Sequence, residues 1–160
     1  MSVHSEGPGR GAEFTISLPW EARRPVAAED PVAEPDASRA LRVLVIEDIR
    51  DAAETLRDLL QVFGYQVEVA YDGLDGLRKA REFHPDVVLC DIGLPGMDGY
   101  SLASELRRNP STALARLIAV TGYGTEADRR RAREAGFEAH LTKPVSPDML
   151  EEVLRAAPGT

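Results

Sequence analysis

The chain has 160 residues, 43% hydrophobic and 29% charged, which is typical of one soluble globular domain with an additional segment. The formal net charge of −8 disfavours nucleic-acid binding, which needs clustered Lys and Arg. The single cysteine, Cys90, excludes an internal disulfide and favours a reducing compartment. No apolar run approaches the roughly 18 residues of a membrane span, and the N-terminus lacks the apolar core of a signal peptide. We therefore expect a cytoplasmic chain with no nucleic-acid or membrane contact.

The first 40 residues differ in composition from the remainder. Apolar and polar residues alternate over residues 13–18, which predicts a short strand. No other strand is predicted nearby, so we expect this strand to lack a partner and residues 1–40 to be flexible or loosely packed. Residues 21–40 hold three prolines among Ala, Glu and Asp, a composition typical of an extended linker.

From residue 41 onward, short apolar runs alternate with helical patterns. The runs are rich in Val, Leu and Ile, as strands buried on both faces of a parallel sheet are; they cover residues 42–46, 66–70, 86–90, 116–120 and 138–141. The intervening segments are predicted helices; they cover residues 50–63, 73–83, 99–108, 125–136 and 146–156. Residues 50–63 place apolar residues at three- and four-residue spacing, which gives one apolar face. Five such units predict a doubly wound α/β sandwich around a parallel sheet.

Three of these helices have clear starting residues. Asp72 and Asp98 are predicted caps of the second and third helices. The fourth is expected to begin with a capping box formed by Thr125 and Asp128 and to end at Gly136.

Polar residues follow the predicted strands where ligands bind in such folds, at the carboxyl ends. Glu47 and Asp48 follow the first strand, Asp91 the third, Thr121 the fourth and Lys143 the fifth. Each residue alone would be ordinary as a cap, a turn residue or a solvated charge. Their joint occurrence, with each group at the end of a different strand, predicts a site.

Several carboxylates close together favour a divalent cation, and an all-oxygen ligand set suits Mg²⁺. A carboxylate such as Asp91 is a known type of nucleophile for phosphoryl transfer. Lys143 supplies a compact positive charge, and the Thr121 hydroxyl is a donor for a phosphoryl oxygen.

Residues 41–157 resemble the receiver domain of bacterial response regulators. The motifs that carry the resemblance occur in the family's order: VLVIED at 43–48, DVVLCDIGLPGMDG at 86–99, IAVTG at 118–122 and HLTKP at 140–144. The resemblance implies a flavodoxin-like (βα)5 sandwich with strand order 2-1-3-4-5.

The resemblance also implies the roles of the site residues. Asp91 would accept a phosphoryl group from a phosphohistidine on a histidine kinase or a histidine phosphotransfer protein. Asp48, Asp91 and the Gly93 backbone carbonyl would ligate Mg²⁺ directly, and Glu47 would act through water. Lys143 would pair with the phosphate. The peptide bond between Lys143 and the proline that follows it would be cis.

The switch differs from the commonest family pattern. Thr121 would move toward the phosphate, and the small Gly122 would leave room beside it. The family often has Tyr or Phe three residues before the lysine, where this chain has His140. His140 is therefore the predicted partner of Thr121, either as a pH-responsive ring or as a simple replacement for the usual aromatic residue.

Residues 5–19 resemble the final Gly-rich loop and strand of a histidine-kinase ATP-binding domain. The resemblance implies that residues 1–20 are a remnant of that domain, 21–40 a linker, and 41–157 the C-terminal receiver of a hybrid kinase. The parts that would bind ATP are absent here, so we expect no enzyme activity on a separate substrate.

Two other functions are compatible with the sequence. A receiver-like docking module would regulate a histidine kinase without obligatory phosphorylation, although such modules usually lose some of the residues found here. A haloacid-dehalogenase-type hydrolase would need a second acid two residues after the nucleophile, where this chain has Gly93. The sequence predicts no oligomeric state.

Overall fold

The structure is a computed structural model that describes residues 2–5, 12–15, 40–122 and 124–156. It divides into two units, Met1–Pro35 and Asp36–Thr160. The predicted linker lies almost wholly outside the described residues.

The first unit contains a two-stranded antiparallel sheet made by β1 (Ser2–Ser5) and β2 (Ala12–Thr15). The expectation that the N-terminal strand has no partner is therefore wrong. Ser2–Ser5 supplies the partner, since antiparallel strands need only a short connection between them. The strand also begins one residue earlier than predicted, and residues 16–18 of the prediction lie outside the described part.

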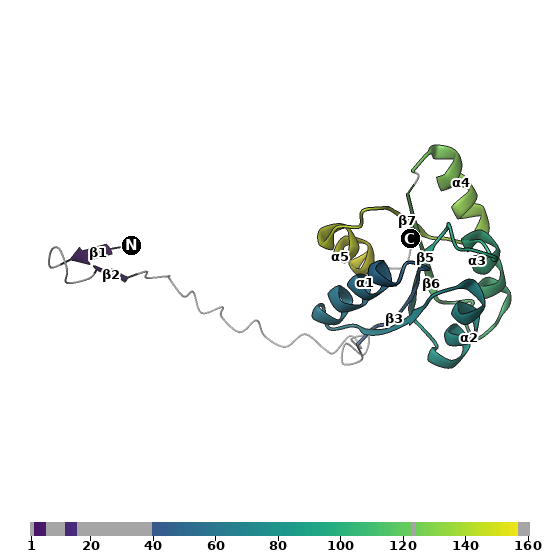
Figure 1. Ribbon diagram of the computed structural model, residues 1–160, viewed down its shortest axis with the longest axis horizontal. Helices are drawn as coiled ribbons and strands as arrows, with labels where there is room; N and C mark the ends of the chain where they lie inside the picture. Colours follow the sequence, from purple (N-terminus) through teal and green to yellow (C-terminus); the bar gives the residue numbers. More distant parts are fainter. Residues whose placement is uncertain (1, 6–11, 16–39, 123, 157–160) are drawn as a thin grey trace, which may run out of the picture. The chain divides into compact units, whose positions relative to one another are not determined.

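The second unit is a parallel sheet covered by helices on both faces (Figure 1). Its strands are β3 (Arg42–Ile46), β4 (Gln66–Ala70), β5 (Val87–Asp91), β6 (Arg116–Thr121) and β7 (Ala139–Thr142). Its helices are α1 (Arg50–Val62), α2 (Gly73–Phe83), α3 (Gly99–Arg108), α4 (Glu126–Ala135) and α5 (Pro147–Arg155). The strand order β4-β3-β5-β6-β7 confirms the predicted order 2-1-3-4-5.

Successive residues of each strand point to opposite faces, so the sheet separates two apolar cores. Val43 and Val45 of β3 pack with α1 and α5, including Leu60 and Leu150. Alternate residues of the same strand, such as Leu44, pack with α2, α3 and α4 on the other face. Burial on both faces explains why the strands read as continuous apolar runs.

Three of the strands end one residue later than predicted. The ladder between β5 and β6 extends to Asp91, which is the register partner of Val120, and the Ile92 N–H donates to the Val120 carbonyl at 3.0 Å. Asp91 and Thr121 are thus the last residues of their strands. Two candidate site residues therefore belong to the rigid sheet and not to loops.

Side-chain caps fix the helices that follow the sheet. The carboxylates of Asp72 and Asp98 accept from N–H groups of α2 and α3, at 2.8 and 2.7 Å. Thr125 caps α4, but the Asp128 carboxylate accepts from the Thr125 hydroxyl at 2.5 Å, whereas a capping box uses the backbone N–H. Well-defined helix starts hold the connections at the carboxyl end of the sheet in place.

Candidate functional site

The structure brings the predicted site residues together at the carboxyl end of the sheet. Glu47 and Asp48 directly follow β3, Asp91 ends β5, Thr121 ends β6 and Lys143 directly follows β7. Strands β3 and β5 are hydrogen-bonded neighbours, and so are β5 and β6, and β6 and β7. Their carboxyl ends therefore meet in one place.

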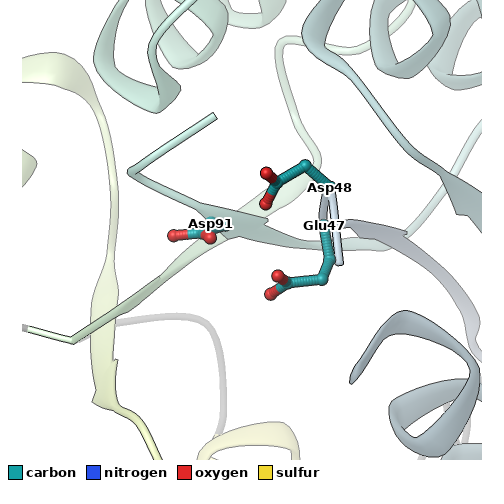
Figure 2. A group of neighbouring side chains, drawn as sticks. All are labelled: Glu47, Asp48 and Asp91. Carbon is teal, nitrogen blue, oxygen red and sulfur yellow. The ribbon is translucent and has the colours of Figure 1, made fainter. Parts of the chain in front are cut away.

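Three carboxylates form the centre of this site (Figure 2). Glu47, Asp48 and Asp91 each offer one oxygen, and these oxygens all lie within 4.8 Å of one another. Glu47 is only 1% exposed and Asp91 8%, whereas Asp48 is exposed. The cluster thus has two buried acids and one acid open to solvent.

The chain enters α1 without a side-chain cap. Ile49 is the N-cap residue, and its N–H donates to Glu47 Oε1 at 3.4 Å.

The ammonium group of Lys143 lies between the two buried acids. Its Nζ is 2.6 Å from Glu47 Oε2 and 2.8 Å from Asp91 Oδ2. Burial alone would lower the pKa of Lys143, but the hydrogen bonds that it donates to Asp91 and Glu47, together with the charges of these acids, outweigh burial and raise it. Lys143 is therefore held as a cation.

Both oxygens of the Asp91 carboxylate have a donor. The Gly93 N–H donates to Oδ1 at 2.9 Å, and Lys143 Nζ donates to Oδ2 at 2.8 Å. Two donors from different parts of the chain fix the plane of this carboxylate. The structure therefore gives Gly93 a contact through its N–H, in addition to the carbonyl role that the resemblance implies.

Thr121 and Lys143 are linked through the backbone. The Thr121 carbonyl accepts from the Lys143 N–H at 2.8 Å, and Thr121 itself is only 7% exposed. A Cβ on Gly122 would meet nothing within 4 Å apart from its two chain neighbours, so space is open beside Gly122. The peptide bond between Lys143 and Pro144 is cis, as the resemblance implies.

His140 lies on β7, the strand at the sheet edge, and is partly buried. Its Nε2 is buried and has no hydrogen-bond partner among the described residues. A Cβ on Gly124, in the loop between β6 and α4, would lie 3.8 Å from the His140 Cε1 atom. The ring thus lies close to Gly124.

The contact between Glu47 and Lys143 was not predicted from the sequence, which assigned Lys143 to the phosphate alone. One signal pointed to it. Glu47 directly follows four apolar residues, and an acid that continues a buried strand is rarely fully buried without a cation.

The donor set fits Mg²⁺. All the side-chain ligands are carboxylate oxygens, they come from two neighbouring strands, and the exposure of Asp48 leaves one side open to water. Mg²⁺ in proteins typically uses one or two carboxylates and keeps several waters.

No helix in the described part of the chain has the length and apolar character to cross a membrane.

Comparisons with known proteins agree with this geometry. Residues 43–155 match the response regulator receiver domain family. The polar-differentiation response regulator DivK of Brucella ovis is 33% identical over 114 residues, which are 71% of this chain and 93% of DivK. The gliding motility regulatory protein of Myxococcus xanthus is 34% identical over 113 residues, 71% of this chain and 14% of that protein.

Solved structures share the fold. The chemotaxis protein CheY4 of Vibrio cholerae has a TM-score of 0.70 at 26% identity, over 72% of this chain and 97% of CheY4. The receiver domain of sensor histidine kinase PA1611 from Pseudomonas aeruginosa has a TM-score of 0.67 at 29% identity, over 72% of this chain and 95% of that receiver domain. That receiver holds a magnesium ion in its active-site cleft. With five parallel strands in the order 2-1-3-4-5 and an acidic cluster at their carboxyl ends, the chain belongs to the response regulator receiver domain family.

Proposed function

We propose that this protein accepts a phosphoryl group on Asp91 from a phosphohistidine on a histidine kinase or a histidine phosphotransfer protein. The observation that carries the proposal is the Asp91 carboxylate, held between the Gly93 N–H and the Lys143 ammonium beside two further acids. A buried carboxylate with fixed donors and a nearby cation has the properties of a phosphoryl acceptor.

In the transfer step, a carboxylate oxygen of Asp91 forms a bond to phosphorus as the bond from phosphorus to the imidazole nitrogen breaks. The imidazole nitrogen keeps the electron pair and takes up a proton. Asp48, Asp91 and the Gly93 carbonyl would hold Mg²⁺, with Glu47 acting through water, and the ion would supply charge neutralisation for the phosphoryl oxygens. Lys143 is already placed at Asp91 Oδ2 and provides a second positive charge.

The signal would then pass through Thr121 and His140. Thr121 is the last residue of β6, and Gly124, in the loop that follows it, lies close to the His140 ring. A shift of Thr121 toward the phosphate would move that loop and change the space available to the ring. His140 supports this role because its buried Nε2 has no partner in the described structure that would hold the ring in place.

The setting of the domain is part of the same proposal. Residues 1–20 would be a remnant of a kinase ATP-binding domain, 21–40 a linker, and 41–157 the C-terminal receiver of a cytoplasmic hybrid kinase. The domain would signal through protein contacts or onward phosphotransfer, and not as an enzyme acting on a separate substrate.

Intact-mass spectrometry after treatment with acetyl phosphate and MgCl₂ tests the chemistry. We expect wild-type protein to gain one phosphoryl mass, and we expect no gain without Mg²⁺ or in Asp91→Asn. Asp86→Asn is a matched control, because the Asp86 carboxylate accepts from the Arg42 N–H at the opposite end of the sheet.

A wild-type chain that gains no mass from acetyl phosphate or from a phosphorylated histidine kinase would contradict the proposal. That result would favour a docking module that regulates a kinase without being phosphorylated.

A further inference from the structure

The connection between β5 and α3, residues 92–98, sets the direction of the Asp91 carboxylate. It supplies the Gly93 N–H that donates to Asp91 Oδ1. Its first residue is bonded on one side to β6, where the Ile92 N–H donates to the Val120 carbonyl at 3.0 Å. On the other side, the Ile92 carbonyl accepts from the Gly99 N–H at 3.1 Å. The backbone beside Asp91 is thus held between a strand and the first residue of a helix.

Gly99 makes this second contact possible. A Cβ at Gly99 would lie 2.6 Å from the Asp91 carbonyl oxygen and 2.8 Å from Ile92 Cα. Both of these are backbone atoms, so no side-chain rotation would relieve the overlap. Any other residue at this position would push α3 and the backbone of Asp91 apart.

A second glycine holds the far end of the same connection. A Cβ at Gly73, the first residue of α2, would lie 3.0 Å from Met97 Cβ and 3.3 Å from the Met97 carbonyl oxygen. This contact is tight but less severe than the one at Gly99. Two helices therefore approach residues 92–98 closely, each through a glycine.

We propose that Gly99 is a positioning residue for the phospho-acceptor, with Gly73 as a weaker support. Because Gly99 has no side chain, α3 can hold the Asp91 backbone where the carboxylate meets both the Gly93 N–H and Lys143 Nζ. These bonds, at 2.9 and 2.8 Å, lengthen if the backbone of Asp91 moves by a few tenths of an ångström. The inference rests on the proposed function, since it concerns the same acceptor.

The test compares Gly99→Ala, Gly73→Ala and Gly136→Ala. Gly136 is a matched control, because it ends α4, has φ of 104°, and a Cβ there would lie 2.9 Å from Arg107 Cγ. Gly136→Ala is therefore expected to destabilise the fold without touching residues 92–98. Three quantities are measured: the melting temperature, the initial rate of phosphorylation by saturating acetyl phosphate with MgCl₂, and the amide resonance of Gly93.

We expect Gly99→Ala to slow phosphorylation by roughly 10- to 100-fold and Gly73→Ala by roughly 2- to 10-fold, as misplaced reacting groups do. Gly136→Ala should stay within about twofold of wild type at a temperature where all variants are folded, since only its stability is changed. The Gly93 amide resonance should move in the first two variants and stay in place in the third.

Two results would overturn the inference. One is a pair of folded Gly99→Ala and Gly73→Ala variants with wild-type rates and an unmoved Gly93 resonance. The other is a Gly136→Ala variant that slows phosphorylation as much as Gly99→Ala, which would assign the loss to stability. If Gly99→Ala does not fold, Gly73→Ala decides by the same criteria.

A wild-type chain that is never phosphorylated would end the proposed function but not this inference. The Gly93 resonance reports the geometry around Asp91 without phosphorylation. A shift in Gly99→Ala and Gly73→Ala but not in Gly136→Ala would still support the positioning role.

Discussion

The two ends of the central sheet use charged side chains in different ways. At the amino end, charged groups mainly satisfy the backbone, and the acid Glu138 is outnumbered by its two cationic partners, Arg107 at 3.1 Å and Arg116 at 3.5 Å. Arg107 donates to the carbonyls of Gly136 and Ala115, both at 2.7 Å, and Asp86 accepts from the Arg42 N–H at 2.8 Å. These contacts provide hydrogen-bond partners for backbone groups at helix ends and turns, because buried or partly buried polar groups need such partners.

At the carboxyl end, charged groups face one another. Glu47, Asp48 and Asp91 share one small space, and Lys143 contacts two of them. An arrangement with three acids around one ammonium is costly for folding alone, since like charges repel and burial penalises ionised groups. The charged groups at the carboxyl end therefore form the candidate site, whereas those at the amino end stabilise the fold.

Removing the cation from the carboxyl end should have the largest effect. Lys143→Met leaves Glu47 and Asp91 without their partner, so the free energy of unfolding should fall by about 3 kcal/mol. Phosphorylation by acetyl phosphate should slow at least about tenfold, because a positive charge beside the phosphoryl group is lost. Urea unfolding and mass spectrometry measure the two effects, and a variant with wild-type stability and rate would remove the basis for the contrast.

Removing a cation from the amino end should affect stability alone. Arg107→Met keeps an unbranched apolar side chain but leaves the carbonyls of Gly136, Ala113 and Ala115 without this donor. We expect a loss of about 2–3 kcal/mol in the free energy of unfolding. The phosphorylation rate of the folded protein should remain within about twofold of wild type. A large fall in that rate would mean that the two ends are coupled.

A substitution of Asp48 should distinguish metal binding from folding at the carboxyl end of the sheet. Because Asp48 is exposed, Asp48→Asn should change the free energy of unfolding by less than about 0.5 kcal/mol without metal. Mg²⁺ should raise the melting temperature of wild-type protein, since it binds the folded state, and should raise that of the variant much less. Thermal unfolding with and without saturating MgCl₂ measures the difference; equal shifts would exclude Asp48 as a ligand.

High pH should produce the smallest effect. The pKa of Lys143 is raised in the folded protein above its ordinary value of 10.5, so folding favours the protonated amine. The resulting stabilisation is complete below pH 10.5 and is lost as the pH rises through the folded pKa. The free energy of unfolding of wild-type protein should therefore decrease more steeply above pH 10.5 than that of Lys143→Met. Parallel curves of unfolding free energy against pH for the two proteins would contradict this prediction.

The sheet and the place of the site followed from local patterns in the sequence. Buried strands are marked by runs of Val, Leu and Ile, and helix starts by residues such as Asp72, Asp98 and Thr125. The parallel arrangement then brings Glu47, Asp91 and the other strand-end residues together. The strand order and the cis peptide bond came from family resemblance, and both are present in the structure.

Other features depend on contacts between distant residues, which local patterns do not contain. The ion pair between Glu47 and Lys143 and the close approach of Gly99 to Asp91 both arise only when elements pack. The pairing of β1 with β2 was missed for a different reason, since Ser2–Ser5 is too short to produce a periodic signal. Three predicted strands also ended one residue too early, because the hydrogen-bond ladder of a strand continues until its neighbour stops pairing.

The order of the site residues along the chain has a consequence for protein synthesis. Glu47 precedes Lys143 by 96 positions (143 − 47), and Asp91 precedes it by 52, so the ammonium is the last part of the site to leave the ribosome. A nascent chain that ends before β7 holds the three acids but not their cation. If Asp91 accepts a phosphoryl group as proposed, a truncated product that lacks the last strand would keep the acceptor but lose the lysine beside it.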